Sequence, residues 1–329
     1  MDNYKREYKG KNILITGGCG CIGSNLVRAL LEAGVKKVTV LDDLSASCMW
    51  NVEGATVIVD SVTSEVVGNI LKRDKYDIVF HLAAHFANQN SIDHPKDDLN
   101  TNGFGTLNVL EQSRLNGVKR VVYASSGCSV YGSQAPLPLK EDYVSLHLDT
   151  PYQIHKLLGE LYCNFYVNYY KFPVAIARYF NVFGRGEIPG AYRNVIPNFM
   201  WRALHKQPLL ITGTGEETRD FTYVGDIVDG TMRLGVMPEA IGQAFNLASE
   251  TETRVIDLAN MINELTGNKN NISYIPRRDW DKIIRRRASI EKARKVLGYE
   301  PKTKVKDGIK EVYQWELDNS ENIKKDAKF

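Results

Sequence analysis

The chain has 329 residues, and at about 150 residues per domain this length predicts two domains. Hydrophobic residues make up 43% and charged residues 25%, which excludes an intrinsically disordered chain. The 42 basic and 39 acidic residues leave a net charge of +3 with neutral histidine, so charge gives no reason to expect a nucleic-acid partner.

The first twelve residues, MDNYKREYKGKN, are polar, so we expect no secretory signal. The longest apolar runs have the length of a strand, far below the roughly 20 residues of a membrane span, so we expect no membrane partner. The five cysteines include no CxxC pair, which argues against a disulfide scaffold and against a metal site. These features predict a cytoplasmic protein of the size of an enzyme.

In the first half of the chain, short runs rich in β-branched residues alternate with helical stretches. The predicted strands are 11–15, 37–41, 55–59, 78–82, 120–124 and 174–178. The helices predicted between them include 24–33, 106–116 and 151–170. Near-continuous apolar runs are typical of parallel strands buried on both faces. The alternation therefore predicts an α/β fold with a Rossmann-type doubly wound parallel sheet.

The second half is less regular and predicts a smaller, mixed α/β C-terminal domain. We expect domain boundaries at 1–180, with returning segments near 222–250, and at 181–329, chiefly 181–221 and 251–315. Predicted elements in this half are a loop over 185–194, helices over 195–205, 255–266 and 290–297, and a strand over 209–212. The polar tail 320–329 is expected to be frayed.

A glycine-rich turn follows the first predicted strand. The sequence TGGCGCIG over 16–23 places Gly17, Gly20 and Gly23 just before a helix expected to open at Ser24. Such a turn lets the backbone approach a pyrophosphate, whose charge the helix N-terminus stabilises, whereas a glycine pattern by itself also fits a plain tight turn.

Acidic residues at the ends of the next two strands support dinucleotide binding. Asp42 lies 19 residues after Gly23, close to the spacing at which an acid hydrogen-bonds a ribose 2′-hydroxyl. Because a carboxylate there repels a 2′-phosphate, NAD is favoured over NADP. Asp60 is placed either to meet the adenine or simply to end the third strand. Residues 1–180 are therefore the predicted NAD-binding domain.

The segment DTPYQIHK holds the candidate proton-transfer pair. Thr150 and Pro151 are typical of a helix start, so Tyr152 and Lys156 lie one turn apart on one helical face. A phenol with a pKa near 10 is a poor base at neutral pH, but a nearby ammonium lowers that pKa. The alternative is an amphipathic helix in which this Tyr and Lys meet by chance.

At this point the chain resembles the extended branch of the short-chain dehydrogenase/reductase superfamily, the nucleotide-sugar epimerases and dehydratases. The resemblance covers about residues 10 to 300. It rests on TGGCGCIG (16–23), DDLS (42–45), HLAA (81–84), NGFGTLNVLE (102–111), SSGCSVYG (125–132), YQIHK (152–156), RYFNVFG (178–184) and RDFTYVGD (219–226).

The resemblance implies a role for each matching position. Tyr152 would be the catalytic base and Lys156 its electrostatic partner. The implied NAD-binding residues are Gly17, Gly20, Cys21, Ile22, Gly23, Asp42, Asp43, Asp60, Ser61, Leu82, Ala83, Ala84, Asn102, Ser125, Tyr152 and Lys156. The implied sugar-nucleotide residues are Asn88, Ser126, Asn181, Val195, Arg219 and Arg278. For Arg278, which stands in a basic run, a solvated surface is an equal alternative.

The chain departs from the family at Gly127, where relatives usually have the Ser or Thr that hydrogen-bonds the sugar. We take Ser126 as the third catalytic residue, while Ser125, Ser129 or a water could also fill this role. Sugar 4,6-dehydratases carry an Asp-Glu pair after that position, and nucleotide-linked glucuronate decarboxylases carry a glutamate at Ser129. This chain has Cys128 and Ser129, so a phenol, an ammonium and NAD remain.

A phenol, an ammonium and NAD together favour epimerisation at C4 of a nucleotide-diphosphate sugar, a UDP-hexose, through a transient 4-keto intermediate. The alternatives on the same scaffold are a 4-dehydrogenase or reductase, a 2-epimerase and a 4,6-dehydratase. A dinucleotide-sensing protein without chemistry is the alternative from another class, and the intact Tyr152 and Lys156 argue against it. We expect His155, beside the base, to face away from it.

The resemblance also implies a homodimer. Relatives pair the helices that correspond to about 101–116 and 153–170 into a four-helix bundle. Here the second helix carries an apolar stripe of Leu157, Leu161, Phe165 and Tyr169. The alternative is that this stripe packs on the sheet.

Overall fold

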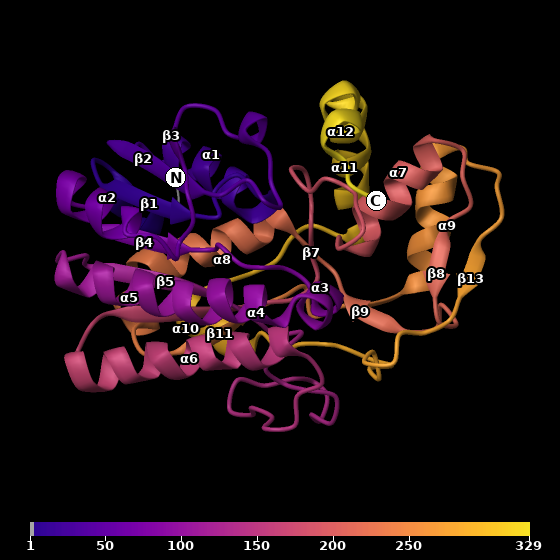
Figure 1. Cartoon of the computed structure of the whole chain (residues 1–329). Coiled ribbons are helices and arrows are strands. Elements are labelled where there is room, and N and C mark those ends of the chain that lie inside the picture. Colours follow the sequence, from indigo (N-terminus) through magenta and orange to yellow (C-terminus); the bar gives the residue numbers. More distant parts are fainter. Residues whose placement is uncertain (1–2) are drawn as a thin grey trace.

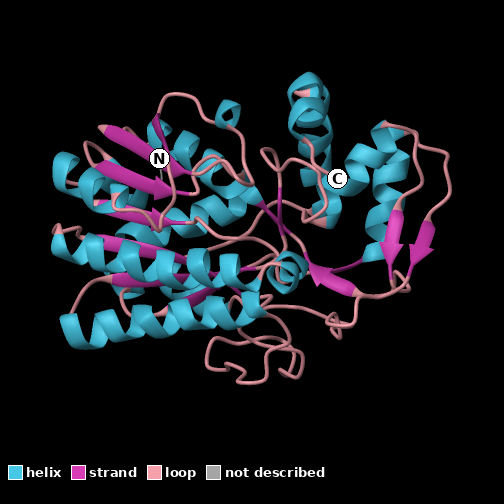
Figure 2. Ribbon diagram, in the orientation of Figure 1, coloured by secondary structure: helices cyan, strands magenta, loops and turns pink. Residues whose placement is uncertain are grey.

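The computed structural model describes residues 3–329 and is built on a seven-stranded parallel sheet (Figures 1 and 2). Its strand order is β11-β6-β5-β4-β1-β2-β3. The strands are β1 (Asn12–Thr16), β2 (Lys37–Asp42), β3 (Thr56–Val59), β4 (Ile78–His81), β5 (Arg120–Ser126), β6 (Val174–Tyr179) and β11 (Ala244–Leu247). All six strands predicted in the first half of the chain are present in this sheet, and the doubly wound α/β fold is confirmed.

Successive residues of the strands point to opposite faces of the sheet, and helices cover both faces. Ile13 and Ile15 of β1 pack with α1 (Cys21–Glu32), α8 (Val224–Val236) and α10 (Glu291–Leu297). Leu14 packs on the opposite face with α2 (Val66–Asp74), α5 (Thr106–Leu115) and α6 (Pro151–Tyr170). The expectation that every strand is buried on both faces is wrong for β3, because β3 lies at the sheet edge and its Thr56 and Val59 are exposed.

A second lobe stands beside the C-terminal ends of the strands, at the right of Figure 1. Its core lies between α7 (Val195–Leu204), α9 (Val255–Thr266) and α11 (Val305–Asp318). Three small sheets complete it: β7 (Val182–Phe183) with β10 (Thr222–Tyr223), β8 (Leu210–Thr212) with β13 (Ser273–Ile275), and β9 (Thr218–Asp220) with β12 (Glu252–Arg254). This lobe is mixed α/β, as the sequence predicts, while the exact domain boundaries stay a prediction.

Several short elements were not expected. They are η1 (Asn3–Tyr8), η2 (Met49–Asn51), α3 (Asn88–Asp93), α4 (Pro95–Asp98), the π-helical turn η3 (Leu99–Gly105) and η4 (Pro238–Ala240). Helix α1 begins at Cys21, three residues before the expected Ser24. Among the described residues, no helix is long and apolar enough to cross a membrane.

The expectation of a frayed C-terminal tail is wrong. The tail forms α12 (Ser320–Asp326), and the Nε1 of Trp50 donates to the Oδ2 of Asp326 at 2.7 Å. The indole of Trp50 also stacks on Trp315, with ring centroids 5.9 Å apart. Beyond α12, the carbonyl of Lys328 accepts from the backbone N–H of Ala191 at 2.8 Å. Ile323 of α12 is buried as well, so one apolar side chain and these polar contacts together hold the tail against the rest of the protein.

A buried ion pair joins helix α6 to strand β6. Glu160 accepts two hydrogen bonds from the guanidinium of Arg178, at 2.8 and 3.0 Å, and both side chains are almost fully buried. The hydroxyl of Ser125 donates to the same carboxylate at 2.5 Å. Arg178 also donates to the hydroxyl of Tyr131 at 3.0 Å. Every charged group of this cluster therefore has a partner, which is what makes a buried charge tolerable.

Replacing Glu160 by alanine should lower the free energy of unfolding by about 3–5 kcal/mol, because Arg178 would be left buried without a counter-charge. Urea unfolding followed by circular dichroism measures this loss. Asp257→Ala is the matched control: it removes an equally well-formed but exposed pair with Arg254 and should change stability by less than about 1 kcal/mol. Equal effects of the two variants would contradict this assignment.

Candidate active site

One cleft of about 920 Å³ runs along the C-terminal ends of the strands, between the sheet and the second lobe. It lies where the strand order reverses between β1 and β4, the position at which open α/β sheets bind ligands. All the site residues that the sequence predicts line this cleft except Ser61 and Asn102. Ser61 instead turns back into its own loop, where its hydroxyl lies 2.9 Å from that of Thr63.

The glycine turn fits a dinucleotide pyrophosphate. Gly17 has a φ of +71°, and a Cβ there would lie 2.6 Å from the backbone nitrogen of Ala83. A Cβ on Gly23 would lie 2.4 Å from the carbonyl oxygen of Gly17. Gly20 is the N-cap of α1 and gives it no side-chain cap, so the first N–H groups of the helix have no intrahelical partner. Those N–H groups, beside a cleft, form a site for a phosphate anion.

Two acids at the end of β2 accept hydrogen bonds from neighbouring loops. Asp42 is buried, and its carboxylate accepts from the N–H groups of Cys19 and Leu44 at 2.9 and 3.0 Å. Asp43 accepts from the N–H and hydroxyl of Ser45 at 2.9 and 2.6 Å. Asp42 therefore ties the loop after β2 to the glycine turn and presents a fixed negative charge in the cleft.

Helix α6 presents Tyr152 and Lys156. Thr150 caps the helix by accepting from the N–H of Gln153 at 3.4 Å, as the sequence predicts. The Nζ of Lys156 donates to the carbonyl of Ala124 at 2.9 Å and lies 5.7 Å from the centroid of the Tyr152 ring. Burial lowers the pKa of Lys156 to about 8, although the carboxylate of Asp98 acts in the opposite direction.

The expected lowering of the Tyr152 pKa by Lys156 is not seen. Burial raises the pKa of Tyr152, and the nearby Asp98 and Cys128 raise it further. The tyrosine is buried and packs edge-on against Phe86, with ring centroids 6.0 Å apart. Burial of the ring therefore favours the neutral phenol.

The presence of glycine at position 127 has a steric explanation. A Cβ at this position would lie 1.9 Å from the ring of Phe180, which is fully buried, so Ser or Thr fits there only if that ring moves. Ser126 and Ser129 both line the cleft and are joined by a hydrogen bond of 2.9 Å. Ser125 also lines the cleft, but its hydroxyl is used by Glu160. The two linked hydroxyls of Ser126 and Ser129 are thus polar groups close in sequence to Gly127 that line the cleft.

The predicted sugar-nucleotide residues lie toward the second lobe. Arg219 is paired with Asp281, its Nη2 lying 3.3 Å from both carboxylate oxygens. Arg278 is exposed, lines the cleft and has its guanidinium 5.9 Å from the Trp280 ring centroid. Val195 is the first residue of α7.

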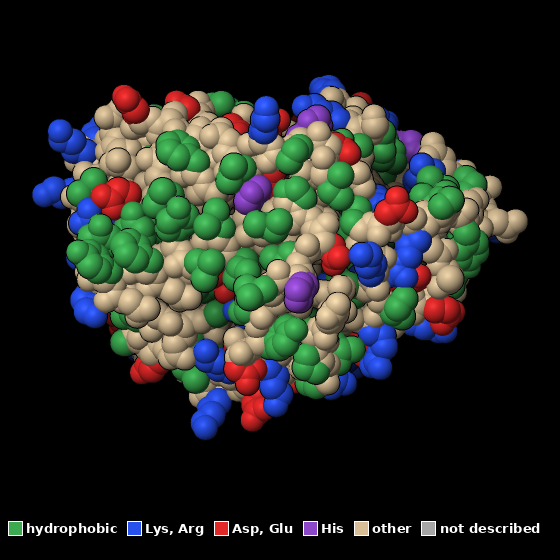
Figure 3. All heavy atoms as spheres, turned by 60° about the horizontal axis from the view of Figure 1, so that its bottom comes forward, with side chains coloured by type: hydrophobic (Ala, Val, Ile, Leu, Met, Phe, Trp, Pro, Cys, Tyr) green, Lys and Arg blue, Asp and Glu red, His purple; other side chains and the backbone are tan. Residues whose placement is uncertain are grey.

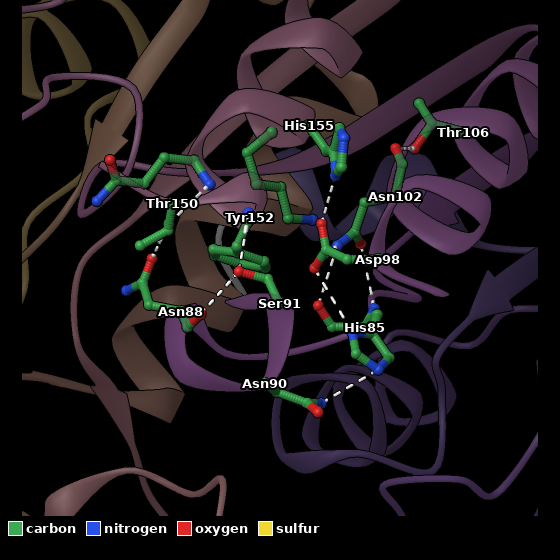
Figure 4. Close-up of polar contacts among 12 residues, drawn as sticks. His85, Asn88, Asn90, Ser91, Asp98, Asn102, Thr106, Thr150, Tyr152 and His155 are labelled. Atoms are coloured by element: carbon green, nitrogen blue, oxygen red, sulfur yellow. Dashed lines mark hydrogen bonds and ion pairs between the residues drawn. The ribbon is translucent and has the colours of Figure 1, made fainter. Parts of the chain in front are cut away.

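The two predicted asparagines are partly used within the protein. The Oδ1 of Asn88 accepts from the hydroxyl of Thr150 at 2.8 Å, so this side chain also steadies the start of α6 (Figure 4). Asn181 accepts from the thiol of Cys128 at 3.2 Å and has a φ of +28°. Asn102 stays behind the cleft wall, where it exchanges hydrogen bonds of 2.9 and 3.1 Å with the backbone of His85.

Arg286 is a cleft residue that the sequence reasoning missed. It is only 3% exposed, and its Nη1 donates to the carbonyl of Gly127 at 3.1 Å. Its Nη2 is buried without a hydrogen-bond partner in the structure. The sequence shows only an arginine run over 285–287, which reads as a solvated surface, so no local signal separates Arg286 from its neighbours.

Fold and cleft together define an NAD-dependent enzyme of the extended short-chain dehydrogenase/reductase type. A model of the NAD dependent epimerase/dehydratase family matches residues 13–248, and the chain belongs to this family. Its cofactor is NAD.

Three relatives illustrate the range of the similarity. A solved epimerase of Methanothermobacter thermautotrophicus is 51% identical, with a TM-score of 0.97 over 99% of this chain and 98% of that one. The UDP-glucose 4-epimerase of Mycolicibacterium smegmatis is 35% identical over 90% of this chain and 95% of its own length. The UDP-N-acetyl-alpha-D-glucosaminuronate decarboxylase of Bacillus cytotoxicus is 33% identical over 94% and 99%.

Gly127→Ser should lower the free energy of unfolding by about 1–3 kcal/mol, because the added side chain overlaps the Phe180 ring. In a Phe180→Ala background the same substitution should cost almost nothing, since the space is then free. Chemical denaturation of the four proteins gives this cycle. A cost for Gly127→Ser that is the same in both backgrounds would show that Phe180 does not determine this position.

Proposed function

We propose that this protein epimerises C4 of a nucleotide-diphosphate sugar, a UDP-hexose, through a transient 4-keto intermediate. The observation that carries the proposal is the position of Tyr152 and Lys156 in the same cleft as the glycine turn. Positions 128 and 129 hold Cys and Ser, so the acids that elimination or decarboxylation would use there are missing.

In this proposal the N-terminal lobe holds NAD. Gly17, Gly20 and Gly23 would contact the pyrophosphate. Asp42 would accept hydrogen bonds from the hydroxyls of the adenosine ribose, and the loop over 82–84 would lie beside the nicotinamide. NAD bound there would supply the acceptor for the hydride from C4 and the donor that reduces the 4-keto sugar again. Each turnover regenerates the oxidised cofactor, so the chain's own residues have only to hold the sugar and move one proton.

The proton step belongs to Tyr152. Its phenolate takes the proton of the sugar 4-hydroxyl and later gives it back, while the ammonium of Lys156 stabilises the negative charge. The linked hydroxyls of Ser126 and Ser129 lie beside Gly127 and offer a hydrogen bond to the sugar oxygen in place of the missing Ser or Thr. Binding in a defined geometry supplies most of the acceleration, because hydride donor and acceptor must be in contact.

The second lobe would hold the diphosphate while the keto sugar turns over. Arg219 and Arg278 line the cleft there, and a guanidinium binds phosphate oxygens through two parallel hydrogen bonds. The unpartnered Nη2 of Arg286 offers one more donor at the sugar end, next to Gly127. Asn181 completes the polar side chains at this position.

Overall similarity does not choose the reaction, because the epimerase and the decarboxylase relatives are almost equally identical to this chain. A 4-dehydrogenase or reductase, a 2-epimerase or a 4,6-dehydratase on this scaffold is distinguished by its products. An epimerase leaves the amount of NAD and of water unchanged, whereas a dehydrogenase consumes free cofactor and a dehydratase releases water.

UDP-glucose deuterated at C4 and mixed with the NAD-loaded protein should give UDP-galactose that retains the deuterium, with no net NADH. NMR of the product measures both its configuration and its label. Tyr152→Phe should lower turnover by at least about 10²-fold and leave bound NAD in place, because only the proton step is lost. Tyr313→Phe, on α11, is the control and should keep full turnover.

Stoichiometric NADH formation would replace the epimerase with a dehydrogenase. Undiminished turnover of Tyr152→Phe would show that another group is the base. Repeating the assay with UDP-N-acetylglucosamine and the dTDP-sugars tests the choice of substrate independently of the choice of reaction.

We propose further that the protein is a homodimer that pairs its α6 and η3–α5 faces. Leu161 and Tyr169 of α6 are 57% and 71% exposed, so the predicted stripe does not pack on the sheet beyond Leu157. Phe104 and Leu115 of the neighbouring η3 and α5 are also exposed. Figure 3 shows hydrophobic side chains gathered on this side of the molecule, at the left of the view. An apolar face of this extent fits an interface between two copies.

Light scattering at micromolar concentration should give twice the mass of one chain. Leu161→Glu with Phe165→Glu should give monomers, because two buried charges would face each other across the interface. Leu146→Glu is the control, since Leu146 is 88% exposed but lies on the loop before α6. A monomeric parent protein would remove the dimer from the proposal.

A further inference from the structure

The loop after β2, residues 43–51, leaves the sheet beside the glycine turn and reaches the C-terminal helices α11 and α12 (Figure 1). Its Ser45, Ala46 and Ser47 line the cleft. The hydroxyl of Ser47 donates to the carboxylate of Asp42 at 2.7 Å, so the loop also holds the acid that would bind the adenosine ribose. The loop is therefore a wall of the cofactor end of the cleft, the part beside the glycine turn.

The tip of this loop has no buried residues of its own. Leu44 and Val52, near its two ends, pack against the core of the N-terminal lobe. By contrast, none of the three residues of η2, which form the tip, is buried. A surface segment with few buried contacts opens at a low cost in free energy. The position of the tip therefore depends on contacts with other parts of the chain.

Trp50, in η2, makes such contacts with the C-terminal helices. Its Nε1 donates to the Oδ2 of Asp326 on α12 at 2.7 Å, and its indole stacks on Trp315 of α11. A hydrogen bond to a carboxylate is stronger than one between two neutral groups. Because α11 belongs to the core of the second lobe, this contact joins a loop of the first lobe to the body of the second.

Two further contacts join the same loop to the segment that follows β7 and enters the second lobe. The Nδ2 of Asn51 donates to the carbonyl of Cys19 in the glycine turn at 3.1 Å and to the carbonyl of Gly186 at 3.0 Å. The guanidinium of Arg193 donates to the carbonyl of Ala46. The loop is thus attached to chain of the second lobe at three of its residues.

The segment after β7 also lies against the start of α1. The Nδ2 of Asn25 donates to the carbonyl of Arg185 at 2.9 Å. A Cβ on Gly186 would lie only 2.9 Å from the hydroxyl oxygen of Ser24. The glycine turn and the first turn of α1 are therefore in contact with both the loop after β2 and this segment. A dinucleotide whose pyrophosphate lies at the glycine turn would be enclosed by them.

We propose that Trp50 and Asp326 are positioning residues of the cofactor site: their hydrogen bond keeps the loop after β2 closed over NAD, and NAD leaves only after the loop has detached from the C-terminal helices. This role rests on the part of the proposed function that places NAD in the N-terminal lobe, and it does not depend on the sugar or on the reaction. Slow release suits an enzyme that regenerates its oxidised cofactor in each turnover, because the site then needs no refilling.

The test measures the release of radiolabelled NAD from the loaded protein after mixing with an excess of unlabelled NAD. The label that stays with the protein after rapid desalting is followed with time. Trp50→Phe keeps an aromatic ring beside Trp315 but removes the N–H donor, and Asp326→Ala removes the acceptor. Each should release NAD about tenfold faster, the fold-change that corresponds to the loss of one hydrogen bond to a charged group. The double variant should be no faster than the faster single variant, because both substitutions remove the same bond.

Lys324→Ala is the matched control on the same helix. It removes an exposed ion pair with Glu321, of 3.0 Å, that does not involve the loop, so its release rate should stay within about twofold of the parent protein. Hydrogen exchange of the loaded protein gives a second readout. In Trp50→Phe the amides of residues 44–51 should exchange faster, whereas those of β1 should exchange at the parent rate, because only the loop is detached.

The outcomes separate this role of Trp50 and Asp326 from the proposed reaction. Faster release in the two variants and not in Lys324→Ala supports it, even if no sugar nucleotide is epimerised. An unchanged release rate in Trp50→Phe overturns it. Faster exchange in β1 as well as in the loop also overturns it, because a general loss of stability would then explain the release. If Asp326→Ala does not fold, Trp50→Phe and Lys324→Ala decide by the same criteria.

Discussion

The parallel pairing of β1 with β4 is the constraint on which the rest of the site depends. It places Thr16 beside His81, where their side chains share a hydrogen bond of 2.7 Å, and so fixes how the two strands end. Gly17 then packs against the backbone of Ala83 so closely that no side chain fits between them. Because the glycine turn and the loop after β4 leave the sheet at one point, a single cleft collects groups from both.

The sequence predicted the sheet well because its information is local. Each of the six strands predicted in the first half is a run of five mostly apolar residues between polar or turn residues, and such a run is recognised without knowing its partners. Strand β11 was missed because Ala244–Leu247 contains a polar residue, Asn246, in a run of only four. Asn246 is buried in the structure because its side chain bonds to the carbonyls of Leu139 and Ser289, which no local pattern reveals.

In the candidate site, too, the features that depend on local sequence were predicted and those that depend on distant contacts were not. The glycine turn, Asp42 and the Tyr152–Lys156 spacing were visible because each depends on a short stretch of chain, and all of them lie along the cleft. The partners of these groups are distant in sequence and were not visible. Arg286 meets Gly127 across 159 positions, His155 meets Asp98 across 57, and Phe180 fills the space beside Gly127. The sequence therefore predicted most of the site residues, but not the distant residues that contact them.

The path of the chain between the two lobes has a consequence for protein engineering. After β6 the chain enters the second lobe, returns to the sheet for α8 and β11, leaves again for α9, returns for α10, and ends in α11 and α12. The second lobe is thus assembled from three separate stretches. A chimera that takes its sugar-nucleotide side from a relative would have to exchange all three together, and a protease nick in one crossing would leave the halves associated. Recombination at a single junction is the wrong design for this scaffold.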